Sequence, residues 1–222
     1  MQKNILLVGA TGYIAQNVIK TLGGKKEYNF IKAQRNVNNP RNELHLDFSD
    51  IATVENFQLP EKIHLDGIFF LQGINPQKNT KEITYDHFLK MMQVNIIGPA
   101  LLIKKLYPVI NPNALVLFFS SIAAQKGSYD PSYAAAKSAL TGLLNSLANE
   151  FSSIRFNSIS LGLVENSPVE KGMTEDFKKR HKDKMFGNEL IKVGAVIDTI
   201  ELILKNKSIC TTNVQLDGGF KI

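Results

Sequence analysis

The feature that most constrains the fold is a glycine turn that directly follows a short apolar run near the start of the chain. Residues 5–8 are wholly apolar, as in a central parallel strand buried on both faces, and the run stops at Gly9. Helically spaced apolar residues resume at Val18. The segment therefore predicts a strand, a turn and a helix whose N-terminus would face a phosphate, although an ordinary tight turn fits the pattern equally well. The candidate phosphate contacts are Gly9, Thr11, Gly12, Tyr13 and Ile14.

Short apolar runs and helically spaced segments alternate along the rest of the chain. The runs predict seven strands, at residues 5–8, 28–33, 44–46, 67–71, 114–119, 154–160 and 214–216. The clearest helices are expected at residues 51–57, 84–106, 131–151 and 189–204. This order predicts an α/β fold, a Rossmann-like doubly wound three-layer sandwich around a central, mostly parallel seven-stranded sheet. The length of 222 residues suits a single domain over residues 1–222.

Composition indicates an ordinary globular protein, with 21% charged and 44% apolar residues. The N-terminal apolar run is too short for a signal peptide or a membrane span, so we expect a cytoplasmic protein without membrane attachment. The net charge of +6 includes a basic run at residues 178–184. Without a reading motif nearby, that run predicts a solvated helix face or a mobile loop and no nucleic-acid partner. Cys210 is the only cysteine, so we expect a buried thiol, no internal disulfide and no metal site.

The second predicted strand is followed by Arg35, at a point where many dinucleotide folds carry an acidic ligand for the adenosine ribose. A guanidinium pairs well with a 2′-phosphate. This favours NADP as cofactor, with NAD as the alternative. A plain surface arginine at a strand end would give the same sequence.

Two further strand ends carry candidate cofactor contacts. Asp47 and Phe48 follow the third strand and are placed to edge an adenine ring. Gln72 and Gly73 form another glycine turn after the fourth strand. In an open parallel sheet, ligands bind at this carboxyl edge.

Residues 84–106 predict one long helix that should kink at Gly98 and Pro99. Asn95 lies one turn before the kink on a mostly apolar helix. A buried Asn must find hydrogen-bond partners, and a kinked helix has a freed carbonyl nearby. From this helix alone, a structural role for Asn95 is favoured.

The stretch 120–137 has the composition of an active site. Two hydroxyls, Ser120 and Ser121, follow the fifth strand, and Asp130 with Pro131 then supplies an N-cap and a first helical residue. Tyr133 and Lys137 are four residues apart on the helix that follows. They share one face and lie within reach of a common ligand.

Taken together, these motifs resemble the short-chain dehydrogenase/reductase family over nearly the whole chain. The shared features occur in the family's order: the glycine turn, Asp47-Phe48, Val94-Asn95, the serine pair with Tyr133-x-x-x-Lys137, and Leu216-Asp217-Gly218-Gly219 near the end. Residues 154–157 and 160–162 also resemble the family's sixth strand and the loop after it. The Tyr-x-x-x-Lys spacing is common by chance, but its position in this order is specific.

The resemblance implies hydride transfer between a nicotinamide and a carbonyl or secondary alcohol carbon. Tyr133 would be the general acid or base, with its pKa lowered by Lys137 and the oxidised nicotinamide. Lys137 would also hold the nicotinamide ribose, and Ser121 would hydrogen-bond the substrate oxygen. Asn95 would seat a water that relays protons. The resemblance adds Gly162 and Val164, in the loop after the sixth strand, to the cofactor contacts.

The chain departs from the family pattern at several points. The usual serine-to-tyrosine spacing selects Ser120, whereas the residues that follow the pair select Ser121, which we prefer. Gln72-Gly73 replaces part of the usual Asn-Asn-Ala-Gly segment, and Ala15 replaces the last glycine of the turn. These changes leave a second function open, a non-catalytic dinucleotide-binding regulatory protein. Retention of all four active-site residues favours the enzyme.

The family resemblance also implies assembly into a homodimer or homotetramer. The helix after Asp130 would supply an apolar face for a second subunit, and an intrachain core is the alternative use of that face. The leucines concerned are Leu140, Leu143, Leu144 and Leu147.

Overall fold

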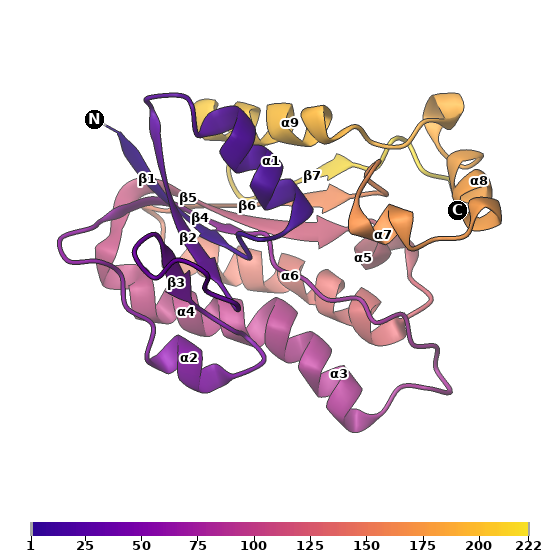
Figure 1. Ribbon diagram of the computed structural model, residues 1–222, viewed down its shortest axis with the longest axis horizontal. Coiled ribbons are helices and arrows are strands. Elements are labelled where there is room, and N and C mark those ends of the chain that lie inside the picture. Colours follow the sequence, from indigo (N-terminus) through magenta and orange to yellow (C-terminus); the bar gives the residue numbers. More distant parts are fainter. Residues whose placement is uncertain (1, 222) are drawn as a thin grey trace.

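The computed structural model describes residues 2–221 and places a seven-stranded, wholly parallel sheet at the centre of the protein (Figure 1). The strands are β1 (Lys3–Val8), β2 (Tyr28–Gln34), β3 (Glu43–His45), β4 (Leu65–Phe70), β5 (Ile110–Ser121), β6 (Arg155–Leu161) and β7 (Thr212–Leu216). Every predicted strand is found. The strand order is β3-β2-β1-β4-β5-β6-β7. The chain reverses its direction of winding between β1 and β4, so the carboxyl ends of these two strands border the crevice where doubly wound sheets bind ligands.

Helices cover both faces of the sheet, as expected for a three-layer sandwich (Figure 1). α1 (Tyr13–Leu22) and α9 (Val193–Lys205) pack on one face. α2 (Ile51–Glu55), α4 (Gly98–Leu106) and α6 (Pro131–Glu150) pack on the other. Near-continuous apolar strands such as Leu65–Phe70 are the local cause, because each of their two faces is buried against a helix layer.

The long helix expected over residues 84–106 is three elements, which corrects the prediction of a simple proline kink. α3 (Tyr85–Met92) continues into a π-helical turn, η1 (Gln93–Ile97), and then into α4. The N–H of Gly98 donates to the carbonyl of Gln93, five residues earlier, so the irregularity precedes Pro99. A π turn inserts one extra residue into the helix, and such turns recur at functional sites. Asn95 lies within it.

Two predictions from the sequence are wrong, the start of the last helix and the burial of Cys210. α9 begins at Val193, four residues after the predicted start, because Ile191 forms an isolated bridge with Val164 and Leu190 is buried beside it. Cys210 is exposed rather than buried, since it lies in the turn between α9 and β7.

The leucines proposed for a subunit interface lie in the core of this chain. Leu140, Leu144 and Leu147 are buried in the core cluster beside β5 and β6, and Leu143 packs at the margin of the same cluster. The intrachain alternative is therefore correct for three of the four.

The segment between β6 and α9 carries two short helices, α7 (Pro168–Lys171) and α8 (Glu175–Lys182), and the 3-10 turn η3 (Phe186–Asn188). The basic run falls largely on α8, which has no buried residue, so the solvated helix face is the correct reading of the two. α5 (Ala123–Lys126) follows β5, and η2 (Tyr107–Val109) precedes it. Across residues 2–221, no helix is both long and apolar enough to traverse a bilayer.

Candidate active site

The glycine turn lies at the carboxyl end of β1 and approaches the backbone after β4. Gly9 has φ +81°, a left-handed conformation that favours glycine, and a Cβ there would lie 2.8 Å from the Gln72 nitrogen. Gly12 is the N-cap of α1 and has no side chain, so no side chain caps the first-turn N–H groups at Tyr13 and Ile14, which leaves them available to a ligand. Thr11 is exposed beside them. This cradle suits a phosphate group.

The loop after β6 lies beside the glycine turn. The Tyr13 hydroxyl donates to the Glu165 carbonyl at 3.2 Å. Gly162 is held by an N–H bond to Leu216, and a Cβ there would lie 3.0 Å from Ile191. Val164 is 5% exposed, so its side chain belongs to the core and only its backbone can meet a cofactor.

At the adenosine end of the predicted cofactor site, the Arg35 side chain is exposed to a ligand, whereas the Phe48 ring is buried. Arg35 is exposed directly after β2 and forms no ion pair within the described part of the chain. Asp47 is half-buried, and its carboxylate accepts the Ser49 N–H at 2.8 Å. Phe48, by contrast, is 4% exposed and packs against Phe70. The expected contact of its ring with adenine is therefore wrong, because the ring fills the core.

Gln72 and Gly73 bring the turn after β4 against the active-site helices. The Gln72 amide donates to the Val94 carbonyl at 3.4 Å. A Cβ on Gly73 would lie 3.7 Å from Lys137 Nζ and 3.8 Å from Asn95 Oδ1. These two polar groups therefore face a common space beside a residue with no side chain.

Asn95 has one satisfied and one unsatisfied polar atom. Its Nδ2 donates to the Met91 carbonyl at 3.0 Å, so the side chain is fixed by its own helix. Its Oδ1 is buried and has no hydrogen-bond partner among the described residues. A buried carbonyl oxygen left open in this way points to a bound water or ligand.

The structure separates the two serines at the end of β5. Ser120 is buried, and its hydroxyl donates to the backbone carbonyl of Lys137 at 3.3 Å. Ser121 Oγ accepts the Ala123 N–H at 3.1 Å, and its hydroxyl is the neighbour whose hydrogen bond lowers the pKa of Tyr133. Successive strand residues point to opposite faces, so only Ser121 faces the phenol.

Burial dominates the titration of Tyr133. It raises the pKa of the phenol, and the hydrogen bond with Ser121 only partly offsets the rise. The decrease expected from Lys137 is not found in the protein alone, because that lysine is itself pulled toward neutrality. Tyr133 is accordingly a protonated phenol near neutral pH.

Lys137 connects α6 to the serine strand. Its Nζ donates to the Phe119 carbonyl at 2.8 Å and lies 5.8 Å from the centroid of the Tyr133 ring. Complete burial lowers its pKa to about 8. A lysine with this pKa can gain and lose a proton near physiological pH, which suits a proton relay.

Two polar residues beside the site were not identified as functional from the sequence. Asp130 was assigned only as an N-cap, and His87 was not singled out. They form a buried pair in which His87 Nε2 lies 2.9 Å from Asp130 Oδ2. A single histidine on a partly apolar helix carries no signal of its own. The only sequence signal for this pair is Asp130 as the N-cap of α6.

A parallel doubly wound sheet with a glycine turn and a Ser-Tyr-Lys group at one sheet edge is typical of a dinucleotide-dependent oxidoreductase. A family profile described as enoyl-(acyl carrier protein) reductase matches residues 16–221. The chain belongs to the short-chain dehydrogenase/reductase family, whose members are NAD(P)-dependent oxidoreductases.

Solved structures agree on the fold. A short-chain dehydrogenase family protein from Francisella tularensis is 20% identical, with a TM-score of 0.87 over 99% of this chain and 98% of that one. A 4-hydroxyisoleucine dehydrogenase complexed with NADH is 22% identical, with a TM-score of 0.85 over 98% of both chains. A small-chain dehydrogenase in complex with NADPH is 19% identical, with a TM-score of 0.83 over 99% of this chain and 98% of that one. No curated protein sequence matches the chain.

Proposed function

We propose that this protein interconverts a carbonyl and a secondary alcohol with NADPH as the preferred cofactor, and that Tyr133 is the general acid or base. The observation that carries the proposal is the placement of Tyr133 between Ser121 and Lys137 at the carboxyl edge of the sheet. Ser121 hydrogen-bonds the phenol, and Lys137 is a proton donor beside its ring. Their arrangement serves proton transfer to an oxygen held at that edge.

Each residue has a distinct role in the proposed reaction. The bound nicotinamide would supply or accept the hydride at the substrate carbon. In the reduction, the protonated phenol of Tyr133 donates its proton to the oxygen that gains negative charge. The Ser121 hydroxyl donates a hydrogen bond to the same oxygen, and this stabilises the developing charge.

The phenolate formed in this step must recover a proton. Lys137, with a pKa of about 8 and its Nζ 5.8 Å from the centroid of the Tyr133 ring, would supply it through a bridging hydroxyl or water. The space beside Gly73 joins Lys137 Nζ to the open Oδ1 of Asn95 and is suited to a water that carries protons onward. The structural and functional interpretations of Asn95 thus combine, because Nδ2 fixes the side chain and Oδ1 faces the relay.

NADPH is preferred in this proposal because the exposed Arg35 follows β2, next to the phosphate-binding turn. The carbonyl at the end of that strand, on Ala33, accepts from the N–H groups of Gly9 and Ala10, so the two strand ends lie together. Solved neighbours include complexes with NADH and with NADPH, so the preference rests on Arg35 alone. The test is the affinity for NADPH and NADH in Arg35→Ala, with Arg180→Ala as a control of equal charge change. Loss of NADPH affinity in Arg35→Ala only is expected, and unchanged affinity would show that the assignment is wrong.

The catalytic role is tested with purified protein, NADPH and a panel of ketones and aldehydes. Tyr133→Phe should lose turnover and keep NADPH binding, because it removes only the phenolic oxygen. Tyr107→Phe, exposed near the opposite edge of the sheet, is the matched control and should retain turnover. Turnover that survives in Tyr133→Phe would reject the mechanism, and cofactor binding without turnover of any compound would favour a regulatory role.

Assembly into a homodimer or homotetramer is retained as a proposal, although most of the leucines first assigned to it are buried within the chain. Exposed apolar side chains on α3 and at its junction with α4, at Phe88, Leu89 and Ile97, support it. Light scattering of the purified protein tests the proposal. A monomer at working concentration would reject it.

A further inference from the structure

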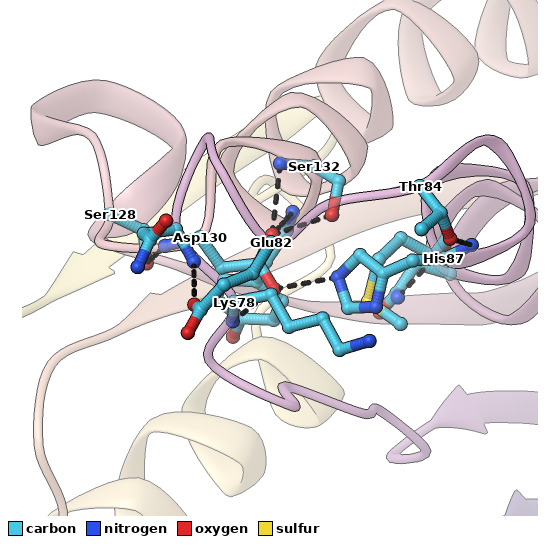
Figure 2. Close-up of polar contacts among 11 residues, drawn as sticks. Lys78, Glu82, Thr84, His87, Ser128, Asp130 and Ser132 are labelled. Atoms are coloured by element: carbon cyan, nitrogen blue, oxygen red, sulfur yellow. Dashed lines mark hydrogen bonds and ion pairs between the residues drawn. The ribbon is translucent and has the colours of Figure 1, made fainter.

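A buried carboxylate joins three segments of the chain at the start of the catalytic helix (Figure 2). Asp130 is fully buried and caps α6. Its Oδ1 accepts the backbone N–H groups of Ser132 at 3.0 Å and Tyr133 at 3.1 Å, together with the Ser132 hydroxyl at 2.5 Å. Its Oδ2 accepts from His87 Nε2 at 2.9 Å and from the Lys78 N–H at 3.2 Å. Both oxygens are therefore fully used.

His87, the α3 residue that donates to Asp130, is itself fixed by its burial and by a backbone hydrogen bond. His87 is 9% exposed, and its backbone N–H donates to Thr84 Oγ1 at 3.2 Å, the N-cap of α3. The same helix continues into the π turn that carries Asn95. The His87–Asp130 contact consequently ties the helix of Asn95 to the helix of Tyr133 and Lys137.

The loop between β4 and α3 is tied to the same point. Besides the Lys78 N–H, the Asn79 side chain donates to the Tyr129 hydroxyl at 2.8 Å, next to Asp130 in sequence. This loop includes Gly73, which borders the space between Lys137 and Asn95. One carboxylate thus fixes the positions of all the segments that meet at the proposed proton relay.

We propose that His87 and Asp130 are positioning residues for Tyr133. They hold the first turn of α6 so that the phenol lies against Ser121. They also hold the loop that contains Gly73 in place beside Lys137. This inference rests on the proposed function. The Tyr133 N–H contact carries it, because a shift of Asp130 moves the backbone of the proposed catalytic residue directly.

The test compares His87→Phe, which removes the donor and keeps a ring, with His87→Gln, which restores an N–H donor near Nε2. Ile200→Val, on the buried face of α9 and far from the site, controls for lost stability. The first readout is steady-state kinetics. His87→Phe should lower kcat by roughly tenfold with an unchanged KM for NADPH, since a misplacement of about 1 Å can cost up to about a hundredfold in rate. His87→Gln should recover most of the loss.

The second readout does not depend on activity. Protein labelled with fluorotyrosine gives a fluorine resonance for Tyr133, assigned by its loss in Tyr133→Phe. This resonance should move in His87→Phe, return in His87→Gln and stay in place in Ile200→Val. The Tyr107 resonance should remain fixed in all three variants.

The outcomes separate the two proposals. If Tyr133→Phe keeps its turnover, the proposed function fails, and the fluorine signal still decides whether His87 positions Tyr133. A lower melting temperature in His87→Phe, with an unchanged Tyr133 resonance and unchanged kcat, would show a purely structural pair and overturn the inference. So would His87→Gln behaving like His87→Phe, because the restored donor would then have no effect.

Discussion

The Nζ of Lys137 donates a hydrogen bond to the carbonyl oxygen of Phe119, 2.8 Å away, and thereby fastens α6 to the strand that carries the serine pair. Lys137 is 5% exposed and has no carboxylate partner within residues 2–221. The ammonium is therefore buried with a carbonyl as its acceptor. Such a charge lowers the stability of the fold while it serves the chemistry.

The buried ammonium predicts that Lys137→Met stabilises the protein near neutral pH. Burial lowers the pKa of Lys137 from 10.5 to about 8, so folding opposes protonation. The difference corresponds to about 3 kcal/mol, and loss of the bond to Phe119 reduces the expected gain to about 1–3 kcal/mol. Denaturant unfolding of the variant and the wild type measures it. Lys20→Met, an exposed lysine, should change stability little.

The Lys137 ammonium also makes the stability of the fold depend on pH, in a direction that follows from its lowered pKa. Below pH 8 the lysine is charged in both states, so the cost of burial is constant. Between about 8 and 10.5 the unfolded chain binds the proton that the folded protein has released, and wild-type stability rises with pH. The advantage of Lys137→Met should shrink across this window. An advantage that persists unchanged above pH 10.5 would contradict the assignment.

Alanine substitutions of the two serines should have different effects, one on kcat and the other on stability. Ser121→Ala removes the hydroxyl beside the phenol and should lower kcat by about a hundredfold, a typical loss for one oxyanion donor. Ser120→Ala removes a bond to the Lys137 backbone and should cost about 1 kcal/mol of stability with little change in kcat. Kinetics and denaturant unfolding of both variants check this. The reverse pattern would assign the catalytic hydroxyl to Ser120.

If Tyr133 is the general acid or base, as proposed, its titration sets the pH profile of the reaction. Burial raises the pKa of the phenol, so reduction should stay constant through neutral pH and fall only in the alkaline range. Oxidation of the alcohol needs the phenolate and should rise over the same range. Because Ser121 lowers this pKa, the alkaline limb should move to higher pH in Ser121→Ala. Profiles of kcat/KM in both directions test the signs, and a shift to lower pH would falsify the assignment.

The architecture was predictable because it depends on local patterns. Buried parallel strands are apolar on both faces, and the apolar run at residues 67–71 predicts β4 without knowledge of the rest of the chain. The cap of α6 was likewise visible in Asp130-Pro131. Such signals are carried by neighbours in sequence. The seven predicted strands therefore differ from the observed strands only in the residues at which they begin and end.

The errors arise where contacts between distant segments decide the outcome. The ring of Phe48 turns inward because Gly98 leaves room for it, and a Cβ at Gly98 would lie 2.5 Å from that ring. The π turn at Asn95 depends on which carbonyl accepts the Gly98 N–H. The partnership of His87 and Asp130 spans 43 positions and has no local signature. The sequence alone could not rank these alternatives.

Substitution of Gly73 tests the proposed proton relay and leaves the proposed catalytic side chains intact. In Gly73→Ala, the methyl carbon would lie 3.7 Å from Lys137 Nζ and 3.8 Å from Asn95 Oδ1, at ordinary contact distance. Gly73 does not have a positive φ, so the variant should fold with nearly unchanged stability. The methyl group would fill the space suited to a bridging water and leave the buried Asn95 Oδ1 without a partner, while Lys137 Nζ would keep only its bond to the Phe119 carbonyl. We expect kcat to fall at least about tenfold, the lower part of the range for proton-transfer catalysis.

The matched control is Gly24→Ala, where an added Cβ meets nothing within 4 Å and φ is also not positive. It should change neither melting temperature nor kcat appreciably. A solvent deuterium isotope effect on kcat should increase in Gly73→Ala only, because proton transfer becomes slower relative to the hydride step. If Gly73→Ala turns over like the wild type with an unchanged isotope effect, protons reach Tyr133 by a route that does not pass between Lys137 and Asn95.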